Sequence, residues 1–105
     1  MIFEVNTNKG NLSLEKSDGK LFRLQDGDHL YYDEDTDTIT MIHYKSQFRF
    51  GQPPTWNWIR VGVKNPKFIH GISKYRSGLD YIKKTMINDI TKRVYRDLKL
   101  KQLVG

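Results

Sequence analysis

Residues 55–63, TWNWIRVGV, place two tryptophans and an arginine at alternate positions. Side chains alternate between the two faces of a β-strand, so Trp56, Trp58 and Arg60 are expected to share one face. The other face of this strand would carry Asn57, Ile59, Val61 and Val63 and would turn toward the core. Exposed aromatic rings stack on unpaired nucleobases, at about 1–3 kcal/mol per base, while arginine neutralises phosphate. A stacking surface for nucleic acid is therefore one of two interpretations of these residues, and the spacing alone does not choose between them.

The alternative interpretation places the same tryptophans in the core. Tryptophan is a highly buried residue type on average, and the loop at Pro53-Pro54 could cover both rings. A shift of one residue in strand register would likewise reverse every side chain. Phe48 and Phe50 alternate with Arg49 in the preceding segment, and we expect them to lie in the core.

Positive charge is concentrated in the second half of the chain. Residues 1–52 hold six Lys or Arg and nine Asp or Glu, whereas residues 53–105 hold twelve and three, so net charges of −3 and +9 make up the total of +6. Such asymmetry is typical of a chain with an anionic partner, most commonly nucleic acid. With Trp56 and Trp58, the predicted nucleic-acid-binding residues are Arg60, Lys64, Lys67, Lys74, Tyr75, Arg76, Lys84, Lys92, Arg96 and Lys99.

Two other interpretations of these cations remain open. Lysine and arginine along a helix often form only a solvated surface, although such helices usually mix both signs of charge. Binding to a membrane surface is less favoured, because the apolar stripe of the predicted helix is needed to cover the sheet.

Turn-forming residues divide the first half of the chain into short segments. The pairs Asp18-Gly19 and Asp26-Gly27 are typical of tight hairpins. Strands are expected near residues 2–5, 12–15, 21–24, 29–33, 38–44, 46–50 and 56–63. We expect five to seven short strands in an antiparallel β-meander, with the loop at Pro53-Pro54 between the last two.

A helix is predicted after a basic connector over residues 64–76. Ser77 and Asp80 form a capping-box pattern at its start. Apolar residues then recur every three or four positions, at Leu79, Ile82, Met86, Ile87, Ile90, Val94 and Leu98. The expected fold is a single α+β domain over residues 1–105, with a mainly β part at 1–63 and one long amphipathic helix at 77–104 packed on a face of the sheet.

Sites for metals, cofactors and catalysis are not predicted. The acidic run at 33–38 has the alternating Asp residues of a calcium loop but lacks the glycine and the final acidic ligand. His29, His43 and His70 do not have the spacing of a zinc site. A small basic nuclease could use one of these histidines with Lys74, Tyr75 or Arg76, and we set this enzymatic interpretation aside in favour of a non-enzymatic protein.

The absence of cysteine fits a reducing, intracellular and cytoplasmic setting, because neither disulfides nor thiolate metal sites can form. The start of the chain resembles no leader, and no apolar run approaches the length of about 20 residues that spans a bilayer. The absence of alanine and the abundance of lysine suggest a viral or phage-like source.

The function predicted from sequence is a small nucleic-acid-binding accessory protein that binds DNA or RNA mainly through charge. The alternative is a protein-interaction module, such as an inhibitor of a host enzyme or a component of a larger assembly, because Trp, Tyr and Arg are also the residue types that dominate protein interfaces. A homodimer would require an open strand edge or the apolar residues Leu100, Leu103 and Val104.

Overall fold

The computed structural model describes residues 1–8, 10–46, 51, 53, 55–71 and 76–96. The elements in these ranges are mainly strands, arranged in two antiparallel sheets. The predicted meander is therefore wrong: the described strands number nine rather than five to seven, and they do not follow one another across a single sheet.

Sheet A has the strand order β6-β5-β4-β1-β9. Its strands are β1 (Ile2–Val5), β4 (His29–Asp33), β5 (Thr38–Ser46), β6 (Thr55–Lys64) and β9 (Ile87–Asp89). The predicted break near residue 45 is absent, since β5 continues through it to Ser46. Residues 47–50, where the predicted next strand and the core residues Phe48 and Phe50 fall, lie outside the described residues.

Sheet B has the order β3-β2-β7-β8. Its strands are β2 (Leu12–Glu15), β3 (Leu21–Leu24), β7 (Lys67–His70) and β8 (Arg76–Gly78). The predicted basic connector at 64–76 thus contains the end of β6, all of β7 and the first residue of β8. In β7, Phe68 is fully buried, and Lys67 and Ile69 on either side of it are more exposed.

The two Asp-Gly pairs have different roles. Asp18-Gly19 joins β2 to β3 in a hairpin, as predicted, with Gly19 at φ 82° and the Asp18 carboxylate accepting the Lys20 amide. Asp26-Gly27 instead carries the chain from β3 in sheet B to β4 in sheet A, so the second predicted hairpin is wrong. A turn motif specifies the reversal of the chain but not which strands pair afterwards.

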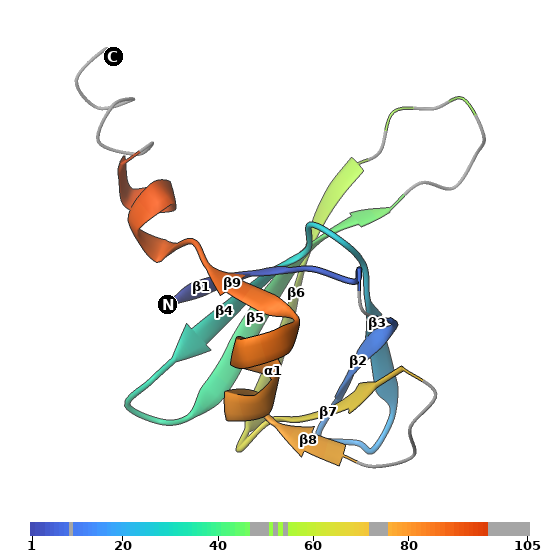
Figure 1. Ribbon diagram of the computed structural model, residues 1–105, viewed down its shortest axis with the longest axis vertical. Coiled ribbons are helices and arrows are strands. Elements are labelled where there is room, and N and C mark those ends of the chain that lie inside the picture. The colour runs from blue at the N-terminus through green and yellow to red at the C-terminus, as the bar shows by residue number, and fades with distance from the viewer. Residues whose placement is uncertain (9, 47–50, 52, 54, 72–75, 97–105) are drawn as a thin grey trace.

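Hydrophobic side chains from both sheets form the core. Sheet A contributes Phe3, Val5, Leu30, Ile39, Ile42, Val63 and Ile87, and sheet B contributes Leu12, Leu14, Leu24 and Phe68. The helix α1 (Leu79–Thr85) contacts β7 and β8 of sheet B and β9 of sheet A, and it buries Leu79 and Ile82. Figure 1 shows α1 in front of the strands, between β9 of sheet A and β8 of sheet B.

The predicted long C-terminal helix is wrong. The helix α1 ends at Thr85, residues 87–89 form the edge strand β9, and helix resumes over residues 91–96. Residues 97–104 of the prediction lie outside the described residues. No helix in the described ranges combines the length and the apolar character needed to cross a membrane.

The interruption has a local cause and a tertiary cause. Asn88 and Asp89 favour turns and caps over helix interiors, and the Asp89 carboxylate accepts the Thr91 amide at 2.9 Å where helix resumes. Hydrogen bonds to Thr91 lower the pKa of Asp89, which favours the charged cap. In addition, β9 supplies hydrogen-bond partners for β1, which would otherwise be an open edge.

The helix also starts differently from the prediction. Its N-cap is Gly78, without a side-chain hydrogen bond, because Ser77 belongs to β8 and pairs with Phe68. The capping-box pattern is therefore not used. The apolar positions were nevertheless correctly predicted up to Ile90, since Leu79, Ile82, Met86, Ile87 and Ile90 are all buried.

Candidate functional site

Strand β6 presents two tryptophans on the outer face of sheet A. Trp56 is 42% exposed and Trp58 is 54% exposed, whereas Val63 is buried and Ile59 packs against the core. The alternation of side chains therefore has the predicted register. The alternative in which both rings are buried in the core is excluded by these exposed fractions.

Neighbouring strands add three more rings beside the tryptophans. The His43 ring stacks on Trp58, with 4.1 Å between ring centroids and 13° between planes, and lies 4.5 Å from Trp56. Tyr31 contacts Trp58 at 5.2 Å, and His29 lies 5.7 Å from Trp56. We call these five rings, His29, Tyr31, His43, Trp56 and Trp58, the aromatic face.

Strand pairing explains how the rings meet. His43 of β5 is the cross-strand partner of both Trp58 of β6 and His29 of β4, so all three side chains project from the same side of the sheet. Among the described strands, β6 is one of the two edge strands of sheet A. His43 covers one side of the Trp58 ring. Because Trp58 is 54% exposed, a large part of its indole remains accessible to a ligand.

Cationic side chains adjoin the aromatic face. The Lys45 ammonium lies 4.9 Å from the centroid of the Trp56 ring, and Arg60 follows Trp58 on the same side of β6. Lys64 projects outward at the end of β6, next to the buried Val63. Along the outer side of β6 two aromatic rings are thus followed by two cations, and Lys45 of β5 lies beside the first ring.

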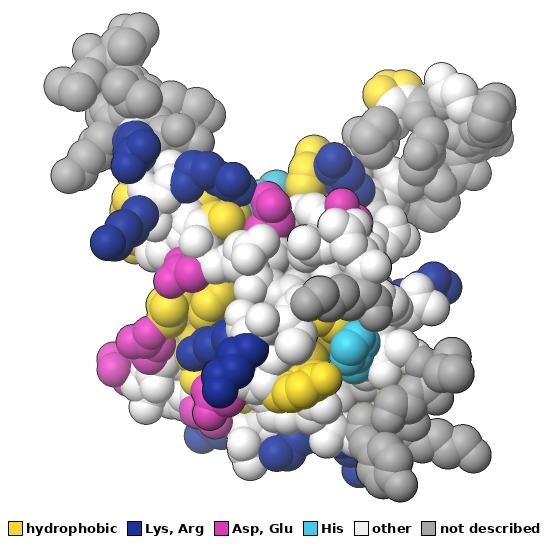
Figure 2. All heavy atoms as spheres, viewed as in Figure 1, with side chains coloured by type: hydrophobic (Ala, Val, Ile, Leu, Met, Phe, Trp, Pro, Cys, Tyr) yellow, Lys and Arg dark blue, Asp and Glu magenta, His cyan; other side chains and the backbone are white. Residues whose placement is uncertain are grey.

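A further arginine reaches the face from the helical residues 91–96. The Arg93 guanidinium contacts the Glu4 carboxylate at 2.8 Å, and the same carboxylate lies 3.7 Å from the His29 ring nitrogen. Figure 2 shows Lys and Arg side chains gathered over this helical segment, whereas around α1 they are mixed with Asp and Glu. The strongest cationic surface in this view is therefore next to β1 and β9.

The buried residue Asp28 fixes the backbone behind the aromatic face. Its carboxylate accepts the Gln25 amide at 2.8 Å and the Lys45 amide at 3.4 Å. Burial raises the pKa of this carboxyl, and the two amide hydrogen bonds oppose that effect. Asp28 thereby ties the loop before β4 to the part of β5 that carries Lys45.

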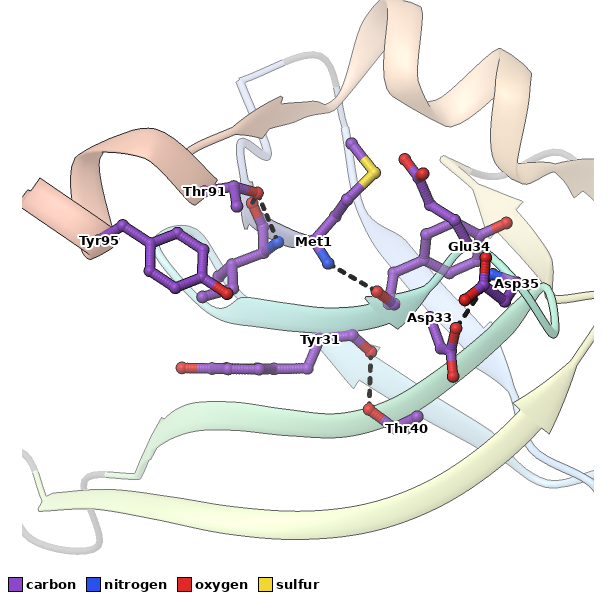
Figure 3. Close-up of a pocket in the computed structure, with 10 residues that line it drawn as sticks. Met1, Tyr31, Asp33, Glu34, Asp35, Thr40, Thr91 and Tyr95 are labelled. Carbon is purple, nitrogen blue, oxygen red and sulfur yellow. Dashed lines mark hydrogen bonds between the residues drawn. The ribbon is translucent and has the colours of Figure 1, made fainter.

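Tyr31 also lines a hollow of about 500 Å³, at the end of the aromatic face that lies away from Lys45 and Trp56. Figure 3 shows Tyr31 and Tyr95 approaching this hollow from opposite sides, with Asp33, Glu34 and Asp35 at its far end. Carboxylates repel phosphate, so this end is unfavourable for a nucleic-acid backbone. Lys45 lies at the opposite end of the face, beside Trp56, so a nucleic-acid backbone is favoured there.

The structure separates the residues predicted to bind nucleic acid. Trp56, Trp58, Arg60 and Lys64 share the outer side of β6. The others lie elsewhere: Lys67 and Arg76 on sheet B, Lys84 on α1, and Lys92 and Arg96 in the helical residues 91–96, while Lys74, Tyr75 and Lys99 lie outside the described residues. The predicted long helix would have placed Lys84, Lys92 and Arg96 along one helix. They do not share a helix, because β9 separates α1 from the helical residues 91–96.

Sequence reasoning missed the contributions of β4 and β5. His29 and Tyr31, and likewise His43 and Lys45, are two positions apart, which is the spacing of residues on one strand face. That signal was present in the sequence. It could be used only with the order β6-β5-β4, which sequence patterns did not provide.

The residues considered for a metal site or a nuclease lie in several parts of the described structure. Within the described ranges, no three His, Asp or Glu side chains are grouped to hold a metal ion. Of the residues considered for a nuclease, Arg76 pairs with Glu15 at 2.8 Å on sheet B, and Lys74 and Tyr75 lie outside the described residues.

The chain was compared with protein-family models, curated proteins and solved structures, and none of the three comparisons found a match.

Proposed function

We propose that this protein is a small non-enzymatic nucleic-acid-binding protein that holds single strands on its aromatic face. The observation that carries the proposal is the pair of exposed tryptophans, Trp56 and Trp58, in contact with His43 and beside Lys45 and Arg60. Stacking platforms with flanking cations are the usual means of binding single strands without sequence preference.

Single strands fit this surface better than duplexes do. The bases of a duplex are stacked on one another, so an aromatic ring on an open sheet reaches them only at ends or in unpaired regions. The accessible part of Trp58 could stack on one base, and Trp56, one strand pleat further along β6, on the next. Each such contact is expected to contribute about 1–3 kcal/mol.

Cations supply the electrostatic part of binding. Lys45, Arg60 and Lys64 lie along β6 and its neighbour, while Lys92 and Arg96 are exposed in the helical residues 91–96. For about four neutralised phosphates, the logarithm of the single-strand affinity should fall against the logarithm of salt concentration with a slope of about −3. This contribution would not distinguish between sequences.

The direct test is fluorescence anisotropy with labelled strands of about 12 nucleotides, in single- and double-stranded DNA and RNA forms, over about 50 to 200 mM salt. Trp emission is recorded in parallel. We expect single strands to bind more tightly than duplexes, with quenching of tryptophan. Absence of binding at the lowest salt would refute the proposal.

A second candidate is a protein-interaction module, and one observation favours it. Strand β6 has no pairing partner on its outer edge among the described strands, so an extended segment of a protein could add to sheet A beside the tryptophans. A protein interface centred on Trp56 and Trp58 would depend on salt much less steeply than phosphate contacts. Salt dependence therefore distinguishes the two candidates.

A further inference from the structure

His43 occupies the centre of the aromatic face. Its ring lies between the two tryptophans, 4.1 Å from Trp58 and 4.5 Å from Trp56, and 5.8 Å from His29. The side chain is half-buried rather than enclosed. A ligand that stacks on either tryptophan must therefore lie against His43 or directly beside it.

The charged groups around His43 are mostly cationic. Lys45 lies on the same side of β5, Arg60 follows Trp58 on β6, and His29 is the neighbour on β4. Two acidic residues near this side of the sheet have partners other than His43. The Glu4 carboxylate of β1 contacts His29 and Arg93, and the Asp28 carboxylate accepts two backbone amides. Among the described residues, no ion pair includes His43.

These surroundings favour the neutral imidazole in the free protein. Burial of the ring, together with the charge of His29, lowers the pKa of His43 from its ordinary value. The two indole rings partly offset this effect, because a cation over an aromatic ring is stabilised by the ring's quadrupole. An anion near the ring would stabilise the protonated imidazole of His43. A phosphate of a bound nucleic-acid strand would be such an anion.

We propose that His43 is a phosphate-binding residue of the aromatic face, so that uptake of a proton on its imidazole accompanies binding of a single strand. The inference rests on the proposed function and adds a regulation to it. By linkage, a strand that raises the proton affinity of His43 must bind more tightly as the pH falls. If the bound phosphate raises the pKa of His43 by about one unit, the full gain in affinity is about tenfold.

The sign of the effect separates His43 from the lysines and arginines. Those side chains keep their charge over the range of about pH 5 to 8 in which histidine titrates, so they contribute equally throughout. At pH 8, His43 would be neutral in both free and bound protein, and only stacking would remain. Near pH 5.5 the imidazolium would add one more phosphate contact, making the salt slope steeper by about 0.7.

The test measures the affinity for a labelled oligothymidylate from about pH 5.5 to 8 at constant ionic strength. Thymine bases keep their charge over this range, so the ligand does not titrate. We expect affinity to rise several-fold toward pH 5.5, and the His43→Phe variant, which keeps a flat ring between the tryptophans, to bind equally at both pH values. His70→Gln is the matched control, because His70 lies on β7 of sheet B and should not alter the pH profile.

Several results would overturn the inference. A wild-type affinity independent of pH would do so, as would a pH dependence that persists in His43→Phe or disappears in a His29→Gln variant. If His43→Phe does not fold, NMR titration of the wild-type imidazole decides the matter: the pKa of His43 must rise when the strand is added. Absence of binding at every pH would refute the proposed function itself, whereas binding without pH dependence would refute the role of His43 alone.

Discussion

Truncation of Trp58 to alanine is the sharpest test of the aromatic face. Trp58 is the more exposed of the two tryptophans at 54%, so a little under half of its surface is covered by neighbours such as His43 and Tyr31. An aromatic side chain has roughly 200 Å² of surface, and at about 25 cal/mol per Å² the covered part stabilises the fold by about 2 kcal/mol. Domains of this size are stable by about 5–15 kcal/mol, so the variant should remain folded.

The effect on binding should be larger for single strands than for duplexes. Loss of one stacked base costs about 1–3 kcal/mol, which corresponds to an affinity lower by about 5-fold to about 150-fold. Duplex affinity should change little, because phosphate contacts by Arg60 and Lys45 remain. Anisotropy titrations of both forms at one salt concentration measure the difference, and thermal unfolding verifies the fold.

Tyr81→Ala is the matched control. Tyr81 is 49% exposed on α1 and contacts His70 rather than the aromatic face, so its truncation removes an exposed ring of similar accessibility. Single-strand affinity should be unchanged in this variant. If Trp58→Ala weakens single-strand and duplex binding by the same factor, or if Tyr81→Ala weakens single-strand binding as strongly, the stacking argument is refuted.

Three further predictions concern charge, backbone and pH. The double variant Lys92→Glu, Arg96→Glu should weaken single-strand and duplex binding alike. It should also make the slope of log affinity against log salt concentration shallower by about one or more. An unchanged slope would show that the helical residues 91–96 are not part of the interface. Gly62 lies at φ 54° with open space around it, so Gly62→Ala should lower the free energy of unfolding by about 1 kcal/mol. Gly78 is equally open but lies at φ −76°, so Gly78→Ala should lower it by less. Equal losses for the two variants in chemical denaturation would contradict this reasoning. The Tyr32 hydroxyl donates to the Asp37 carboxylate at 2.6 Å, which raises the pKa of Tyr32 to about 12. The stabilisation from this hydrogen bond is therefore present below pH 10 and is lost as the pH rises toward 12. Tyr32→Phe should abolish that alkaline loss of stability in a pH series of unfolding curves.

The strands of the first half and the alternation of side chains in residues 55–63 could be predicted from sequence because they depend on local patterns, whereas the exposure of Trp56 and Trp58 stayed open. Alternation in residues 55–63 sets which side chains face the core, and the bounds of β1 to β4 follow from short apolar runs between turns. The periodicity of Leu79, Ile82 and Ile90 likewise identified core residues correctly. Burial, which local patterns report, was therefore predicted better than backbone conformation.

What could not be predicted depends on contacts between distant segments. Ile87–Asp89 lies in a helical pattern, yet it forms a strand because β1 offers a free edge there. Similarly, the turn at Asp26-Gly27 gives no sign that the chain changes sheets. The aromatic face itself exists only because β4, β5 and β6 are neighbours in a fixed register, and no local pattern encodes that order.

The pairing of β9 with β1 has a consequence for synthesis of the chain on the ribosome. The Ile2 amide donates to the Thr91 hydroxyl across 89 positions of sequence, so sheet A cannot be completed until that region has left the exit tunnel. Until then β1 can pair with β4 on one side, while its other edge remains open to neighbouring chains. Nascent or truncated chains that lack residues 87–91 should therefore be the most aggregation-prone forms of this protein, although they already contain every ring of the aromatic face.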